Sequence, residues 1–356
     1  MRAIACAVVL LALAGSARAE RIQQIEVVEN SKTTDATVIL IADIGKGDDF
    51  KPENVPEIEE RLVNSGLFKD VGVWSTPVPG GVKVTIRARD KHSWVIAPTI
   101  YNQPTNKGGG IGFGENNLFG ENKKLLLYAQ LATGDSFFIG AYVDPSIAGS
   151  RFMWQYDVFL RRERVIEYEP PSEMISDLLP VRQSKINYLN NGLKVGFNVA
   201  RALFLTARIR GAYVFYDNVF LAEGATPEQA GADAAGVYTN FDGTTSTTLP
   251  APGGEGWDFS TELTLSYDGT ANWYGITHGD LYRFSIERAL PEIGSDFQYL
   301  YGSAQYVRAR KYFSRHNLVL KTFAGYGDDL PFQQEYTSGG VDLRGYKNRQ
   351  LRGNLR

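Results

Sequence analysis

The sequence predicts a mainly β protein in which a small α+β module precedes an antiparallel β-barrel that spans a membrane. The composition changes near residue 90, because all 19 tyrosines and four of the five tryptophans lie after it. The aromatic-rich part contains about eleven segments of roughly ten residues in which apolar and polar side chains alternate. The charge balance of −3 argues against a broad nucleic-acid surface, which needs a basic excess.

The first 19 residues read as an export signal. Arg2 supplies the positive start, and residues 4–14 form an apolar run that is too short for a membrane-spanning helix. Residues 17–19 give the small-x-small cleavage pattern, so Glu20 is the expected first mature residue. Cys6 is the single cysteine, and we therefore expect no disulfide and no thiol chemistry in the mature chain.

The module at residues 20–91 is predicted to run strand, helix, helix, strand, strand. Thr34 and Asp35 can cap a helix over 36–44, although residues 38–41 would equally suit a strand. The other expected elements are a strand at 22–28, a helix between Pro52 and Gly66, and strands at 68–74 and 82–87 that flank a Pro-Gly-Gly turn.

The alternating strands of residues 92–356 fit either a soluble sandwich or a membrane barrel. The export signal, the aromatic residues near strand ends and the charges on the polar face favour the barrel. Those charges are Asp157, Arg161, Lys194, Glu262, Arg283 and Glu287. The strands are expected at 93–102, 108–117, 123–133, 136–144, 151–163, 186–200, 203–217, 257–268, 280–290, 297–312 and 316–327.

The lengths of the connections support the barrel. With the module on the periplasmic side, odd-numbered strands run outward, and long external loops should follow them. The two longest connections, about 164–185 and 218–256, follow the fifth and seventh strands.

Several stretches resemble the BamA/TamA family of outer-membrane assembly barrels. "EERLVNSGLFKDVGVW" and "GGVKVTIRARDK" look like its periplasmic POTRA domain, and "GFGENNLFGENKKL", "YVDPSIAGS" and "SGGVDLRGY" like its barrel, also called a bacterial surface antigen domain. The resemblance implies a protein of the Gram-negative outer membrane, with the POTRA domain in the periplasm, that inserts other outer-membrane proteins. A secretion pore, or a passive barrel or anchor without clients, are the alternatives.

In that family an Arg-Gly-Phe/Tyr tripeptide follows the eleventh strand and folds into the lumen, where its arginine pairs with carboxylates. The matching residues are Arg344, Gly345 and Tyr346, preceded by Gly339 and Gly340. We expect the nearby Arg349, Arg352 and Arg356 to be solvated, since arginines are mostly exposed. The family's barrels have about sixteen strands, and a membrane barrel must close, so the sequence reads as C-terminally truncated.

The resemblance also implies partners. Unfolded outer-membrane proteins or a secreted client, outer-membrane lipid and periplasmic accessory proteins are expected, and no nucleic acid. A client could add a strand to the module at the strand of Phe68, Val71 and Val73, although a purely structural strand is an equal reading.

No enzyme, cofactor or metal site is indicated. His92, His278 and His316 lack metal-ligand spacing, and "GGGIGFGENN" lacks the Lys-Ser/Thr of a P-loop. Carboxylate pairs such as Glu59-Glu60 and Asp328-Asp329 read as helix-surface or loop charge.

Overall fold

The computed structural model describes residues 20–103, 106–169, 179–200, 202–273, 276–312, 316–339, 343, 344, 346, 347 and 349–356. The predicted export signal, residues 1–19, lies outside them. The chain divides into two compact units. The first comprises residues up to Trp94 together with Glu115–Lys123, and the second comprises Val95–Gly114 together with Lys124–Arg356.

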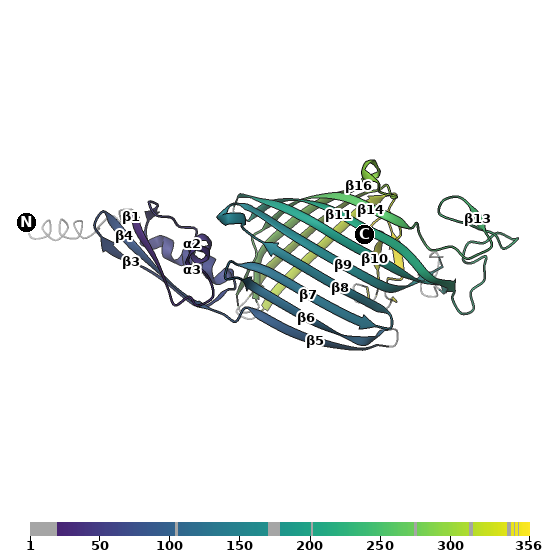
Figure 1. Cartoon of the computed structure of the whole chain (residues 1–356), viewed down its shortest axis with the longest axis horizontal. Coiled ribbons are helices and arrows are strands. Elements are labelled where there is room, and N and C mark those ends of the chain that lie inside the picture. The colour runs from purple at the N-terminus through teal and green to yellow at the C-terminus, as the bar shows by residue number, and fades with distance from the viewer. Residues whose placement is uncertain are drawn as a thin grey trace, which may run out of the picture. The chain divides into compact units, whose positions relative to one another are not determined.

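The first unit packs two helices with a four-stranded sheet in the order β2-β1-β4-β3, in which β1 and β4 are parallel. The predicted order of strand, helix, helix, strand, strand is confirmed, with one additional two-residue strand. The elements are β1 (Glu20–Val28), α2 (Asp35–Ala42), β2 (Asp49–Phe50), the 3₁₀ turn η1 (Pro52–Asn54), α3 (Val55–Asn64), β3 (Phe68–Val78) and β4 (Gly81–Asp90) (Figure 1).

The segment that could have been a helix or a strand is the helix α2. The Thr34 hydroxyl accepts the Thr37 N–H at 3.2 Å, which satisfies one of the donors that a helix start leaves free. Val38 is fully buried in the core of the unit, which also contains Leu62 of α3 and Ile86 of β4. Tertiary burial therefore stabilises a short helix whose β-branched residues disfavour it locally.

Asp90, at the end of β4, orders the loop between β1 and α2. Its carboxylate accepts the backbone N–H groups of Ser31 and Lys32, each at 2.7 Å, and it also bonds the Thr33 hydroxyl. Burial opposes the charge of Asp90, but these hydrogen bonds outweigh it and lower the pKa of Asp90 below its usual value. In the same unit, the Asn117 amide donates to the Thr33 hydroxyl at 2.7 Å.

The second unit is one antiparallel sheet in which the long strands follow one another in sequence order, from β5 to β18 (Figure 1). The eleven predicted strands are confirmed, and those around the two long connections extend further than expected. They are β5 (Trp94–Gln103), β6 (Asn106–Leu118), β7 (Lys123–Ala132), β8 (Asp135–Asp144), β9 (Phe152–Tyr168), β10 (Pro180–Ala200), β11 (Leu203–Leu221), β14 (Gly256–Asp268), β16 (Ile276–Ala289), β17 (Leu300–Tyr312) and β18 (His316–Asp328).

Short elements occupy the connections. Part of the segment 269–279, expected to be a loop, forms β15 and lengthens the hairpin with β16. The short elements are η2 (Ile147–Gly149), β12 (Tyr238–Thr239), β13 (Thr245–Ser246), β15 (Ala271–Trp273), η4 (Pro291–Ile293), β19 (Tyr336–Ser338) and β20 (Leu351–Gly353).

The two faces of the large sheet have inverted polarity. On the outer face Ile209 is 62% exposed and Phe284 is 55% exposed, whereas Arg210 and Asp258, which alternate with the apolar positions, are 5% and 0% exposed. A soluble sandwich would bury the apolar side chains. An apolar outer face with a polar inner face is the pattern of a membrane barrel wall. Within the described residues, no helix is long and apolar enough to cross a membrane.

Candidate functional site on the inner face of the sheet

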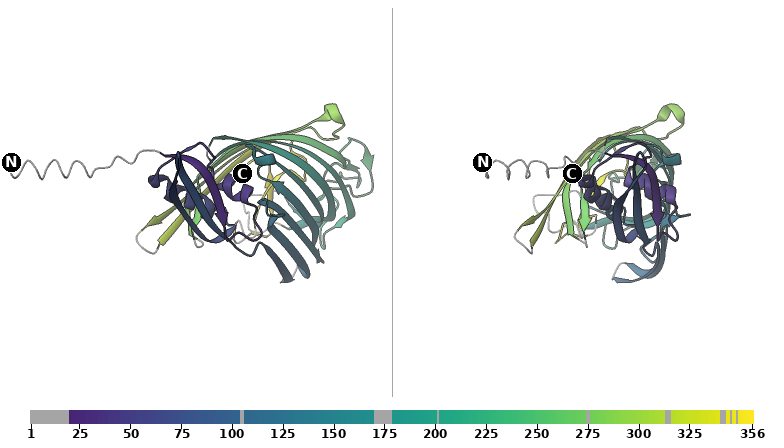
Figure 2. Two further views of the ribbon diagram at one scale, coloured as in Figure 1. Left: turned by 60° about the vertical axis from the view of Figure 1, so that its left-hand side comes forward. Right: turned by 90° about the vertical axis from the view of Figure 1, so that its left-hand side faces the viewer.

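The inner face of the sheet holds the C-terminal segment, defined as the residues between 330 and 356 that the structure describes. Figure 2 shows this segment, in yellow, on the concave side of the curved strands. β19 and β20 pair within it as a short antiparallel hairpin. Its last residues then run along β18, where Gly325 and Arg356 exchange two backbone hydrogen bonds at 2.8 and 2.9 Å. The segment is therefore tied to the sheet by backbone as well as by side chains.

A buried polar group in the sheet wall, the Arg210 cluster, lies behind this segment. Arg210 Nη2 is 3.1 Å from both carboxylate oxygens of Asp258 and 2.8 Å from Glu287 Oε1. The exposed fractions of these side chains are 6%, 0% and 13%. The cluster consists of Tyr188, Arg210, Asp258, Ser260, Glu287 and Tyr299.

Hydrogen bonds from hydroxyl groups stabilise the two carboxylates of this cluster. One guanidinium faces two carboxylates, which on Coulomb attraction alone would leave a net negative charge buried. The Tyr299 hydroxyl donates to Asp258 at 3.0 Å, and the Ser260 hydroxyl donates to Glu287 at 2.6 Å. The pairing of the strands brings these residues together. Arg210 of β11 lies directly opposite Ser260 of β14. Glu287 of β16 lies opposite Glu262, which is two residues after Ser260 on β14.

Gln334 connects the C-terminal segment to the Arg210 cluster. With the amide oriented so that its oxygen faces the guanidinium, Gln334 accepts from Arg210 Nη1 at 2.9 Å and from Nη2 at 3.1 Å. Tyr336 adds an apolar contact, since its ring stacks on Tyr301 with 5.1 Å between centroids. The Tyr336 hydroxyl donates to the Gly302 carbonyl at 2.9 Å. The segment is thus anchored at two neighbouring places on the wall.

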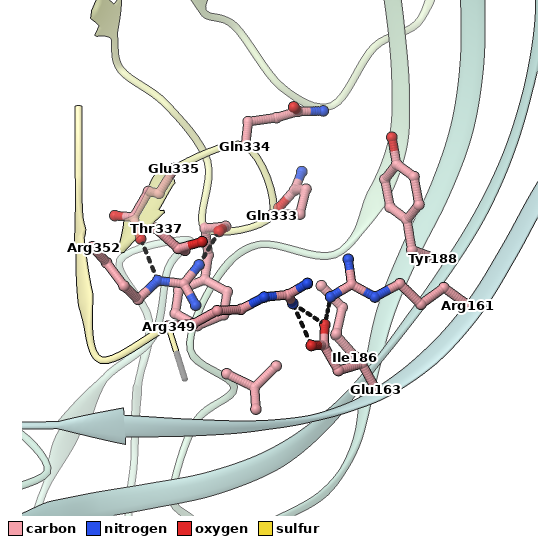
Figure 3. A pocket seen from close by; sticks show the side chains of 12 residues that line it. Arg161, Glu163, Ile186, Tyr188, Gln333, Gln334, Glu335, Thr337, Arg349 and Arg352 are labelled. Atoms are coloured by element: carbon pink, nitrogen blue, oxygen red, sulfur yellow. Dashed lines mark hydrogen bonds and ion pairs between the residues drawn. The ribbon is translucent and has the colours of Figure 1, made fainter. Parts of the chain in front are cut away.

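A cavity of about 290 Å³ lies between the C-terminal segment and strands β9 and β10. Figure 3 shows Arg161 and Arg349 on either side of Glu163, and both guanidinium groups contact that one carboxylate. On the other side, Arg352 Nε is 2.8 Å from Glu335, and its guanidinium lies 3.3 Å from the centre of the Phe332 ring. The cavity is therefore lined by three guanidinium groups and two carboxylates.

These contacts correct the expectation that Arg349 and Arg352 are solvated, because Arg349 pairs with Glu163 and Arg352 pairs with Glu335. Arg356 is exposed, as expected, with its guanidinium 5.7 Å from the Phe323 ring centre. The general tendency of arginine to be exposed could not predict these ion pairs, because the partner carboxylates come from strands or turns that are distant in sequence. The sequence contains a weak indication for Glu163. It lies two residues after Arg161, so the alternation of the strand places both side chains on the inner face.

The residues of the Arg-Gly-Tyr motif lie elsewhere in the segment. Arg344 is exposed, and among the described residues it makes no ion pair, so its docking onto a carboxylate stays a prediction. Tyr346 is half-buried, and Gly340 and Gly345 lie outside the described residues. Gly339 is buried with φ of +133°, and a Cβ there would be 2.1 Å from the Lys347 carbonyl oxygen. The hairpin therefore needs glycine at 339.

The three residues predicted for client pairing lie on β3. Phe68 and Val73 are 2% and 7% exposed and belong to the core of the first unit, against which Val71 also packs. Their side chains are thus structural. The backbone of β3 is available for pairing instead, because among the described residues β3 pairs with β4 alone and is an edge of the sheet.

Comparison with known proteins agrees with this architecture. A family model described as the Omp85 superfamily domain matches residues 117–355. The chain is similar to an outer membrane protein assembly factor BamA from Neorickettsia risticii (strain Illinois), with 22% identity over 221 residues, which are 62% of this chain and 28% of that protein.

Solved structures show the same fold. A BamA structure from Haemophilus ducreyi lacking POTRA domains 1–3 matches 93% of this chain with a TM-score of 0.58 and 17% identity. CdiB from Escherichia coli matches 95% with a TM-score of 0.61 and 14% identity. This chain covers 60% of each of those two chains.

Proposed function

The chain belongs to the Omp85 superfamily, and on that premise we propose that it is an insertion factor of the BamA/TamA type for other outer-membrane proteins. In this proposal residues 20–91 are a POTRA-like periplasmic domain and residues 92–356 are barrel wall in the outer membrane of a Gram-negative bacterium. The coarser role, an Omp85 barrel of protein insertion or secretion, follows from the family itself. The proposed role requires no catalytic chemistry.

The observation that carries the proposal is the open edge of β3 in the first unit. A sheet edge offers a row of backbone donors and acceptors that an extended chain can pair with. Unfolded outer-membrane proteins are chains of amphipathic strands, so they are suitable partners for such an edge. We propose that β3 receives them and that the barrel then helps their insertion.

The inverted polarity of the large sheet supports the second step. Its apolar outer face suits lipid, and its inner face keeps charges such as Arg210 and Glu287 away from lipid. A secretion pore would use the same wall to pass a client through the interior. A passive barrel or an anchor without clients would use the wall alone.

Depletion of the protein in its host tests the proposal. We expect the amounts of several folded outer-membrane proteins to fall, measured by mass spectrometry of outer membranes, while periplasmic proteins stay constant. Unchanged amounts of all outer-membrane proteins would contradict it. A large conductance in planar bilayers that one secreted partner blocks, together with loss of that partner from the medium, would favour the pore.

A further inference from the structure

Glu59 of α3 contacts the edge of β3. The backbone N–H of Val73 donates to Glu59 Oε1 at 3.0 Å. Backbone N–H groups in a strand lie in the plane of the sheet, pointing toward one neighbour or the other. Because β4 pairs with one side of β3, an N–H that reaches a side chain of a helix points to the other side. Glu59 therefore occupies a donor of the free edge.

The neighbouring positions on β3 show which backbone groups of this edge remain available for pairing with another strand. Alternate residues of a strand direct their backbone groups to the same side, so Val71, Ser75 and Pro77 share the edge with Val73. Pro77 has no N–H, which ends the row of donors at that position. Proline and charged side chains at an edge are the means by which natural sheets prevent unwanted pairing.

We propose that Glu59 is a displaceable cap on the β3 edge, which an incoming client strand must remove before it can pair at Val73. The proposal rests on the proposed function and deepens it, because it identifies where the client backbone binds and what competes with it. The partner is an extended peptide whose carbonyl oxygen replaces Glu59 Oε1 as the acceptor of the Val73 N–H. The cap lowers client affinity and keeps the empty edge from pairing with other strands.

The expected effect of removing the cap is modest. The bond from the Val73 N–H goes to a charged carboxylate, but Glu59 is only partly buried, so solvent screening reduces its contribution to about twofold to tenfold in affinity. Glu59→Ala should therefore bind a strand peptide about twofold to tenfold more tightly than the unsubstituted chain. Glu59→Gln keeps an oxygen acceptor and should lie between the two. Glu60→Ala, at the exposed next position, is the matched control and should not change affinity.

The probe is a fluorescein-labelled peptide with the sequence of residues 256–268, an amphipathic strand of this chain, titrated into the full-length protein in detergent. Fluorescence anisotropy gives the affinity. The binding site is identified by disulfide formation between a Ser75→Cys protein, in a Cys6→Ser background, and a peptide that carries cysteine in place of Leu263. Deuterium uptake of residues 68–78 without peptide should rise in Glu59→Ala and stay unchanged in Glu60→Ala.

The outcomes separate the cap from the strand addition itself. Cross-linking of the peptide to the Ser75→Cys protein, with equal affinities for Glu59→Ala and the unsubstituted chain, would overturn the cap and leave strand addition standing. Failure of the peptide to cross-link to Ser75→Cys, with or without Glu59→Ala, would overturn both. If circular dichroism shows that Glu59→Ala loses α3 or β3, Glu59 is a structural partner of Val73 and the inference is wrong.

Discussion

Glu163 of β9 and Arg349 of the C-terminal segment form an ion pair although 186 positions separate them in the sequence. Glu163 is almost fully buried and also contacts Arg161, so one carboxylate balances two guanidinium groups. Without the Glu163 carboxylate, Arg161 and Arg349 would repel each other, because like charges at short distance repel. The pair is the charged contact that holds the far end of the segment to β9.

Replacing Arg349 with glutamine is expected to loosen the C-terminal segment and to leave the sheet intact. A hydrogen bond to a charged group contributes about 1.5–3 kcal/mol, and partial exposure of Arg349 reduces this toward about 1 kcal/mol. Hydrogen–deuterium exchange of residues 349–356 should therefore become several-fold faster. Exchange in β9 and β10 should stay unchanged.

Arg344→Gln is the matched control, since it removes an exposed arginine from the same segment. It should leave exchange of residues 349–356 as it was. If Arg344→Gln loosens the segment and Arg349→Gln does not, the motif arginine carries the anchoring that the family resemblance implies, and the geometry described above does not.

The sequence predicts the strands of this chain far better than its inner-face contacts. Alternation over roughly ten residues is a local pattern, and it identified all eleven long strands and their polar face. β9 and β11 were predicted to end too early and β10 to begin too late, because pairing between long neighbouring strands extends them beyond their regular alternation. The contact between Arg349 and Glu163 depends on how a whole segment folds back, and no local period encodes that.

In the first unit, too, a contact within one helical turn is predictable from the sequence, and a contact between distant elements is not. Thr34 was recognised as a cap because a capping residue acts within one helical turn. Glu59 was read as surface charge because its partner, the Val73 N–H, lies across a helix–sheet contact. A carboxylate that serves a strand edge and one that faces only water look alike in sequence.

Arg210→Ala is expected to destabilise the barrel wall strongly. It leaves Asp258 and Glu287 buried without their common cation, and breaking a buried ion pair typically costs about 3–5 kcal/mol. Arg208→Ala on the same strand and face is the control, because its pair with Asp157 is more exposed and should cost less. The temperature at which the folded band disappears in gel electrophoresis should fall clearly more for Arg210→Ala, and equal falls would contradict the buried cluster.

The first unit is expected to lose stability in acid through Asp90. Hydrogen bonds lower its folded-state pKa below the unfolded value of about 3.9, so the ionised form favours the folded state. That contribution is fully present above the unfolded pKa and is lost as the pH falls through the folded-state pKa. Urea unfolding followed by circular dichroism should show the loss below about pH 4.

Asp90→Asn provides the comparison for this acid effect. The variant should be less stable at neutral pH, by on the order of 1 kcal/mol, and should show a flatter dependence on pH in the acid range. Asp70→Asn, which alters a more exposed pair with Arg87 at 3.4 Å, should keep the acid loss of the parent chain. An acid loss that persists fully in Asp90→Asn would assign it to other carboxyl groups.

Gly339→Ala tests whether the hairpin of β19 and β20 depends on backbone that only glycine adopts easily. The φ of +133° and the Lys347 carbonyl oxygen, 2.1 Å from an added Cβ, together make alanine strained there. Such strain costs on the order of 1–3 kcal/mol, so protease cleavage within residues 336–353 should become faster. Gly353→Ala lies in the same hairpin with no atom within 4 Å of an added Cβ, and it should be cleaved at the parent rate. Equal cleavage of the two variants would mean that the Gly339 conformation does not hold the hairpin in place.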